Sequence, residues 1–438
     1  MNRQSRQNRR RRIADAVRKH PPAPLAPPDS YDPDDVAAML REIGIALVEV
    51  AQPTSIVKDR LTRIASEYTT ERVRAVVLPT MLLIQIGRDA YEIDGSTRSS
   101  LQLDAAGRID QIAGLAEGGA ITPTDAVDAV AAARSRPPRF GKAATITASA
   151  VTSVGFGMMI NPTWAALPGY FFLGLVVGAI LMLSAPLPSL TPVLPTVAAF
   201  VVTLLATWFV AEAANDGLLR VISPALVAAI PGMALAVGAT ELAASQIISG
   251  ASRLVYGISQ LALLVFGVIM GMHLAGPVAP PTPTPHLGSW ALYVAIIVVG
   301  LSLSVYLSAP RGSLFWLTAA IAVALLTQQL ASIFFASIHA GFLGAVAAVL
   351  FANLAARIKT SPPAVVLIVA SFWSLVPSTT SFMDVSQAAT GGNADLGSLG
   401  QVGSAILSIA LGTLVGWSIF RTIDGWLPWS KAAAENGC

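Results

Sequence analysis

From residue 143 to residue 420 the chain consists of apolar stretches of about 20 residues, separated by short polar or proline-rich segments. A helix of this length spans the roughly 30 Å hydrocarbon core of a bilayer. We therefore predict an α-helical polytopic membrane protein with ten transmembrane helices. The stretches cover residues 143–161, 168–185, 192–211, 220–240, 254–275, 289–309, 313–331, 333–355, 363–383 and 400–420.

The charged residues are distributed unevenly. Of 28 Lys and Arg and 25 Asp and Glu, only seven of each group lie beyond residue 142. The first third thus has the composition of a soluble protein, and we predict a small cytosolic α+β domain over residues 34–142. Residues 1–33 are basic and then rich in proline, which is typical of a disordered tail. The net charge of +3 does not indicate nucleic-acid binding.

Within residues 34–142 the apolar periodicity predicts four helices and several strands. Thr122 precedes Pro123, a pair typical of an N-cap followed by the first residue of a helix. The helices are expected at 36–50, 54–68, 105–117 and 123–134, and the strands at 74–87 on both sides of a turn, at 91–93 and at 99–103.

Basic residues predict the orientation in the membrane, because Lys and Arg concentrate in cytoplasmic loops. With ten spans and a cytoplasmic N-terminus, the outside loops hold only Arg220 among the basic residues beyond residue 142. The others fall on the inside: Arg253, Arg311, Arg357, Lys359, Arg421 and Lys431. We expect a multi-pass protein of the inner (plasma) membrane with both termini cytoplasmic. Residues 276–288 would form a proline-rich extracellular linker, and residues 422–438 a cytosolic tail.

Two features recur at nearly the same offset along the chain. Gly267 and Gly271 lie 145 residues before Gly412 and Gly416, and Pro231 lies 146 residues before Pro377. We predict two five-helix repeats, 143–275 and 289–421, which an odd number of spans places in opposite orientations, as in many secondary transporters. The alternative is that each glycine pair only permits close helix packing.

The prolines in mid-span predict broken helices near the centre of the membrane. A proline frees a backbone carbonyl, which in hydrocarbon must face a cavity or packed protein. Breaks at matching places in both halves predict a central substrate-binding site formed by Pro231, Gly232, Pro377, Ser378 and Thr379. The alternative for each proline is a packing kink.

Four further polar residues are candidates for gating or coupling. Glu241 and Arg253 would close a cytoplasmic gate as an ion pair, or would be ordinary interfacial charges. Gln328 would line an outer vestibule or belong to a short loop, and His339 would carry a proton or form a structural hydrogen bond.

Enzyme and metal motifs are missing from the sequence. It contains no phosphate-binding loop, no H-E-x-x-H, no G-x-S-x-G and a single cysteine, Cys438. We therefore predict no catalytic residues, no metal and no cofactor. A central site without a fixed charge suits a neutral or zwitterionic solute, whose charged groups would meet helix ends and backbone carbonyls.

Several blocks of sequence, in order, resemble the bacterial, in particular actinobacterial, threonine/serine exporter family. The first half of the family pattern has a proline-glycine pair, which matches Pro231-Gly232, and a small-glycine-arginine pattern, which matches Ser249, Gly250 and Arg253. The second half departs from it, with Pro377-Ser378 in place of proline-glycine. The blocks are GIALVEVAQPTSIVKDRLTRIA (44–65), VRAVVLPTMLLIQI (73–86), GGAITPTDAVDAVAAARSRPPRFG (118–141) and PALVAAIPGMALAVGATELAASQIISGASRLVYG (224–257).

The resemblance implies ten membrane helices and efflux of threonine and serine driven by the proton motive force. The partners would be the solute, protons and membrane lipid, without nucleic acid; a homo-oligomer is left open. The alternative function is a membrane-anchored hydrolase, or a sensor, that acts through residues 34–142.

Overall fold

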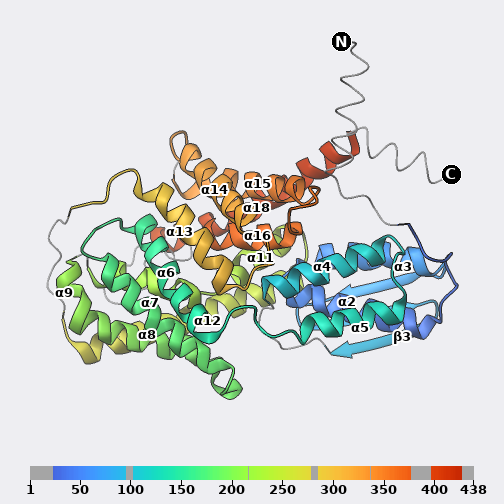
Figure 1. The fold of residues 1–438 in the computed structure, drawn as a ribbon, viewed down its shortest axis with the longest axis horizontal. Coiled ribbons are helices and arrows are strands. Elements are labelled where there is room, and N and C mark those ends of the chain that lie inside the picture. The colour runs from blue at the N-terminus through green and yellow to red at the C-terminus, as the bar shows by residue number, and fades with distance from the viewer. Residues whose placement is uncertain are drawn as a thin grey trace, which may run out of the picture.

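The computed structural model describes residues 23–94, 102–215, 217–277, 285–335, 337–375 and 396–426. An α+β domain lies at one end of the elongated molecule, beside a bundle of apolar helices (Figure 1). The predicted site residues Pro377, Ser378 and Thr379 lie outside the described residues.

The N-terminal domain packs helices and a small antiparallel sheet around one apolar core. Leu82, Ile84 and Ile86 alternate into that core, as a half-buried strand requires. The sheet has the order β1-β2-β3. The elements are α2 (Pro33–Glu49), α3 (Thr54–Tyr68), β1 (Val73–Val77), β2 (Met81–Ile86), β3 (Asp89–Asp94), α4 (Leu103–Glu117) and α5 (Pro123–Arg134).

The four predicted helices and the first three strands are confirmed. Thr122 is the N-cap of α5, and its side chain accepts a hydrogen bond from the backbone N–H of Asp125. The predicted strand at 99–103 is wrong at its end, because Leu103 begins α4. Residues 95–101 lie outside the described part of the chain.

Residues 23–32 were predicted to belong to the disordered tail, but they pack on the domain. The N–H of Leu25 donates to the carbonyl of Gly119, and the N–H of Asp29 donates to the carbonyl of Tyr68. The Asp29 carboxylate also accepts hydrogen bonds from Thr69 and Thr70. These contacts lie far apart in sequence, so proline content alone did not reveal them.

The remainder of the described chain is helical and mostly apolar. Six helices are long and apolar enough to cross a membrane, a bent pair forms a seventh candidate, and three shorter apolar helices accompany them. The chain is therefore a polytopic membrane protein; the number ten stays a prediction. The helices are α6 (Lys142–Ile160), α7 (Leu167–Leu181), α8 (Leu194–Leu205), α9 (Ala211–Ala214), α10 (Leu218–Leu226), α11 (Gly232–Ala243), α12 (Ile247–Ala275), α13 (Ala291–Tyr306), α14 (Leu314–Ala331), α15 (Ser337–Ala355), α16 (Ala364–Leu375) and α18 (Leu396–Trp426).

Two helices extend further than the hydropathy pattern predicted. α12 begins at Ile247, so Arg253 lies within a helix rather than in a loop. α18 continues to Trp426, so the predicted tail at 422–438 begins inside a helix. A membrane helix can continue for one or more polar turns beyond the edge of the bilayer. Hydropathy shows only its apolar part, so it does not show where the helix ends.

The two glycine pairs make the same kind of contact in both halves. A Cβ atom at Gly267 would collide with the backbone of Thr196 at the start of α8, and one at Gly412 would collide with the backbone of Phe342 on α15. Glycine thus lets α12 approach α8, and α18 approach α15. In the predicted numbering, span five packs on span three and span ten packs on span eight, which is the same arrangement in both halves. The repeat and its inversion stay a prediction.

Candidate functional site

The polypeptide breaks its helix at Ile230 and Pro231. A short 3₁₀ turn, η4 (Val227–Ala229), ends the first segment, Ile230 is extended, and α11 begins at Gly232. Pro231 has no N–H to continue the helix, and the two segments meet at 69°. The mid-span break predicted from Pro231-Gly232 is therefore present.

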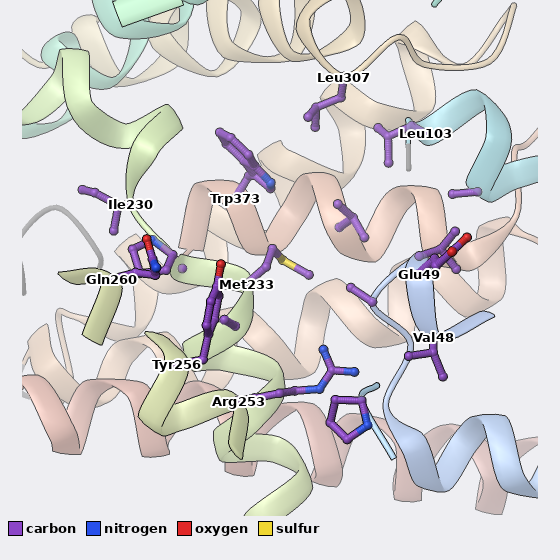
Figure 2. A pocket seen from close by; sticks show the side chains of 18 of the residues that line it. Val48, Glu49, Leu103, Ile230, Met233, Arg253, Tyr256, Gln260, Leu307 and Trp373 are labelled. Atoms are coloured by element: carbon purple, nitrogen blue, oxygen red, sulfur yellow. The ribbon is translucent and has the colours of Figure 1, made fainter. Parts of the chain in front are cut away.

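The break lies on a cavity of about 510 Å³ (Figure 2). Its walls come from three parts of the chain. The first half contributes Pro195, Val227 to Ala234, Arg253, Tyr256 and Gln260, and the second half contributes Leu307, Val369 and Trp373. The third wall is the N-terminal domain, which contributes Ile45, Val48, Glu49, Val50, Ala51, Leu78, Pro79, Met81, Leu82, Leu103 and Ala106.

Both ends of the broken helix face this cavity. The last turn before the break and the first turn of α11, at Gly232 and Met233, belong to its lining. The end of a helix segment carries partial negative charge on its carbonyls, and the start of the next carries partial positive charge on its N–H groups. The two helix ends thus bring partial negative and partial positive charge to the cavity wall without adding a net charge.

Glu241 joins the membrane helices to the N-terminal domain. Its side chain is fully buried; Oε2 lies 3.1 Å from Nε of Arg253, and Oε1 accepts a hydrogen bond of 2.8 Å from the N–H of Thr54. The Arg253 contact is an ion pair without the alignment of a hydrogen bond. Thr54 is the first residue of α3, whose N-cap Pro53 offers no side-chain acceptor. Glu241 therefore caps α3 from α11, where the helix dipole favours a negative charge.

Arg253 connects this capping contact to the cavity. Its side chain is 15% exposed and lines the cavity, and Nη2 is buried without a hydrogen-bond partner among the described residues. A buried guanidinium N–H without a partner costs free energy, so an acceptor in the cavity would be favourable there.

A second buried ion pair neutralises the other charge on the cavity wall. Glu49 accepts two hydrogen bonds from Arg134, 2.7 Å from Nη2 and 3.0 Å from Nε, and Arg134 also reaches Glu42. The bidentate geometry is the strong form of this interaction. Glu241 and Arg253 also form a pair. Neither the Glu49–Arg134 pair nor the Glu241–Arg253 pair therefore adds a net charge to the cavity wall.

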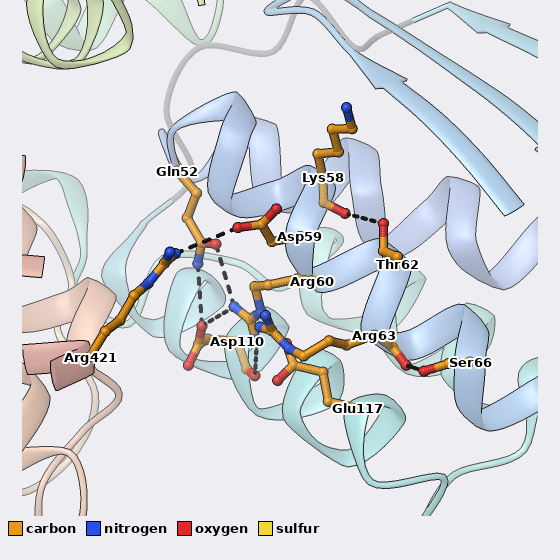
Figure 3. A network of polar contacts seen from close by, with 10 residues as sticks. All are labelled: Gln52, Lys58, Asp59, Arg60, Thr62, Arg63, Ser66, Asp110, Glu117 and Arg421. Carbon is orange, nitrogen blue, oxygen red and sulfur yellow. Dashed lines mark hydrogen bonds and ion pairs between the residues drawn. The ribbon is translucent and has the colours of Figure 1, made fainter. Parts of the chain in front are cut away.

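The N-terminal domain also binds the second half of the membrane part. The N–H groups of Leu103 and Asp104, at the start of α4, donate to the carbonyls of Leu307 and Ser308 after α13. Arg421 of α18 lies 3.5 Å from Asp59 (Figure 3). The domain is thus anchored at several separate points.

The other predicted gating residues do not line this cavity. His339 is exposed, and its Nδ1 lies 3.4 Å from Oγ of Ser408 on α18. Gln328 is half-buried near the end of α14. Reasoning from sequence missed Tyr256, Gln260 and Trp373; a glutamine inside an apolar run was the one visible signal, at Gln260.

The family model described as "Putative threonine/serine exporter" (ThrE) matches residues 38–275, more than half of the chain. The chain belongs to the threonine/serine exporter family. No curated protein matches it, and no solved structure does. The match covers the N-terminal domain and the helices through α12, and so includes the helix break, Glu241 and Arg253. Membership places the chain in a transporter family and agrees with its many apolar helices.

Metal binding has no support in the described part of this family member. No group of three or more His, Cys, Asp or Glu side chains there could hold a metal ion.

Proposed function

We propose that the chain is a secondary active exporter of threonine and serine, driven by the proton motive force. The observation that carries the proposal is the helix break at Pro231-Gly232, which lines a cavity of about 510 Å³ together with Arg253. This volume falls in the range of small-molecule sites, roughly 300–1,000 Å³.

The cavity has the features that a zwitterionic amino acid needs. The solute carboxylate binds Arg253 and the first turn of α11, and the ammonium group binds the carbonyls that end the preceding segment. The hydroxyl group binds polar side chains of the lining, of which Gln260 and Tyr256 are the candidates. Pro377, Ser378 and Thr379 would complete the site from the second repeat.

The basic residues support a plasma-membrane protein with both termini cytoplasmic. Arg253, Arg311, Lys359 and Arg421 each lie at or beside the N-terminal domain, as cytoplasmic loops next to a cytosolic domain would. The cavity then lies toward the cytoplasm, and the N-terminal domain covers that side. Alternating access between the inverted repeats has to separate this domain from at least one half.

The Glu241–Arg253 pair is the proposed cytoplasmic gate and coupling element. A proton on Glu241 would remove its attraction for Arg253 and weaken the cap on α3. The contact of Glu241 with the cavity wall and its contact with the N-terminal domain would then loosen together. Gln328 and His339 remain proposed gating residues on the opposite side, away from this cavity.

The test is flux of radiolabelled threonine and serine in proteoliposomes with the full chain, with and without an imposed pH gradient. Flux that increases with the gradient supports the proposal. Absence of flux for both amino acids, with the protein folded and inserted, would overturn it. The alternative, a hydrolase or sensor that acts through the N-terminal domain, would then be tested on that domain.

A further inference from the structure

A second cavity, of about 710 Å³, lies where the N-terminal domain meets the second half of the membrane part. Four segments form it: α4, the connection from α5 to α6, and the loops after α13 and after α15. Its lining residues are Asp104, Gly107, Arg108, Gln111, Arg136, Pro137, Arg139, Pro310, Arg311, Lys359, Thr360, Ser361, Pro362 and Pro363. We call it the basic cleft.

The basic cleft contains five cationic side chains and one carboxylate. That carboxylate, Asp104, is already shared, 3.4 Å from Arg108 and 3.9 Å from Arg136. Arg311 and Lys359 have neither an ion pair nor a hydrogen bond to any residue that the structure describes. Five cations that share a single carboxylate repel one another, so the cleft favours an anion.

The usual preference of basic residues for cytoplasmic loops explains only part of this cluster. Arg139, Arg311 and Lys359 lie close to the ends of apolar helices, where that preference operates. Arg108 lies on α4 of the N-terminal domain, far from any span in sequence, and still lines the cleft. The fold therefore gathers cations from elements that have no common reason to be basic.

We propose that the basic cleft binds the phosphate group of an anionic ligand, either an anionic phospholipid headgroup or a soluble phosphate compound. One guanidinium group can donate two parallel hydrogen bonds to two oxygens of a phosphate, and a lysine adds a compact positive charge. A single carboxylate would leave most of the cationic charge without compensation. Thr360 and Gln111, which also line the cleft, add neutral donors.

The place of the cleft gives the ligand a structural role. The hydrogen bonds from Leu103 and Asp104 to Leu307 and Ser308 hold α4 against the loop after α13, so both walls are already docked. A phosphate bound between Arg108 and Arg311 would link the N-terminal domain to the second half. This link is separate from the Glu241 contact with the first half, and it does not depend on which solute is transported.

Thermal unfolding of the full chain tests the proposal. One arm adds inorganic phosphate to protein in neutral detergent, against chloride at equal ionic strength. The other compares nanodiscs of phosphatidylcholine with nanodiscs that also contain phosphatidylglycerol. A ligand that binds only the folded chain raises the unfolding midpoint, here by a few degrees. A shift with phosphate indicates a soluble ligand, and a shift with phosphatidylglycerol alone indicates a lipid headgroup.

Matched variants locate the effect. We expect the shift to disappear in R311Q/K359Q, to decrease in R108Q, and to persist in K58Q/R74Q, which removes two exposed cations of the N-terminal domain outside the cleft. If R311Q/K359Q does not insert correctly into the membrane, the shift measured in R108Q decides the test. A shift with neither probe, or one that survives in R108Q at full size, overturns the proposal. These readouts need no flux, so they fail independently of the proposed transport.

Discussion

The carboxylate of Glu241 accepts a hydrogen bond of 2.8 Å from the backbone N–H of Thr54, a residue 187 positions earlier in the chain. A membrane helix thus supplies the cap that α3 of the N-terminal domain lacks within its own sequence. The same carboxylate pairs with Arg253 on the cavity wall. Any movement of α11 away from the N-terminal domain has to break the capping contact.

Glu241→Gln should loosen this junction. Glutamine keeps an acceptor for Thr54 but leaves the buried Arg253 without a counter-charge, which typically costs about 3–5 kcal/mol. We expect faster hydrogen exchange in the first turn of α3 and a weaker response of flux to the pH gradient. Asp59→Asn is the control, because its pair with Arg421 is exposed and such pairs contribute about 0–1 kcal/mol. Equal exchange in both variants would contradict a role of the Glu241 charge in holding this junction.

Arg253→Gln should weaken substrate binding. Hydrogen bonds to a charged group contribute roughly 1.5–3 kcal/mol, so we expect KM for threonine and serine to increase about tenfold to a hundredfold. The double variant E241Q/R253Q removes both charges and should regain stability while KM stays high. A double variant with a normal KM would show that Arg253 acts only through its pair with Glu241.

Pro231→Ala should reduce flux without preventing membrane insertion. Alanine supplies the N–H that proline lacks and permits a continuous helix across the 69° bend, which would remove the helix ends from the cavity. Pro224→Ala is the matched control, since Pro224 lies inside α10 and is absent from the cavity lining. Flux is measured in proteoliposomes, and equal activity of the two variants would argue against a site at the break.

Arg60→Met should strongly destabilise the N-terminal domain. Arg60 is buried and reaches Asp110 and Glu117, each at 2.5 Å (Figure 3). Burial alone would lower the pKa of Arg60, but the two carboxylates outweigh it and raise the pKa. We expect a loss of about 3–5 kcal/mol. Arg63→Met is the control, because Arg63 contacts the same Glu117 at 3.5 Å but is 57% exposed, and should cost at most about 1 kcal/mol. Hydrogen exchange of α3 and α4 in the full chain measures both.

Tyr68 should make the N-terminal domain sensitive to alkali. Burial raises the pKa of Tyr68 to about 12, although its hydroxyl donates to the carbonyl of Ile121. In the unfolded chain the phenol loses its proton near the ordinary pKa of 10.0. Between these values the unfolded state binds fewer protons, so stability falls as pH rises. Denaturation curves from pH 9 to about 12 should show this fall, and Tyr68→Phe should reduce it.

The sequence was sufficient for features that depend on local pattern. Apolar length predicted the membrane helices, alternation predicted β2, and Thr122 before Pro123 predicted the start of α5. Pro231 predicted the helix break because proline acts on its own backbone. Gln328 and His339 show the limit: a polar residue in an apolar run is visible, but its direction depends on helices distant in sequence.

Only the tertiary structure placed the N-terminal domain on the cavity and on the basic cleft. Thr54 and Glu241 are hydrogen-bonded to each other, and Arg108 and Lys359 line the same cleft, although no sequence periodicity links the members of either pair. The sequence by itself determined a polytopic membrane protein with a broken helix, because hydrophobic length and proline chemistry act locally. The sequence predicted the pairing of Glu241 with Arg253, and the structure contains it. The partners of the other buried charges were decided by packing between remote segments, since desolvation makes a charge favourable only where the fold brings its counterpart.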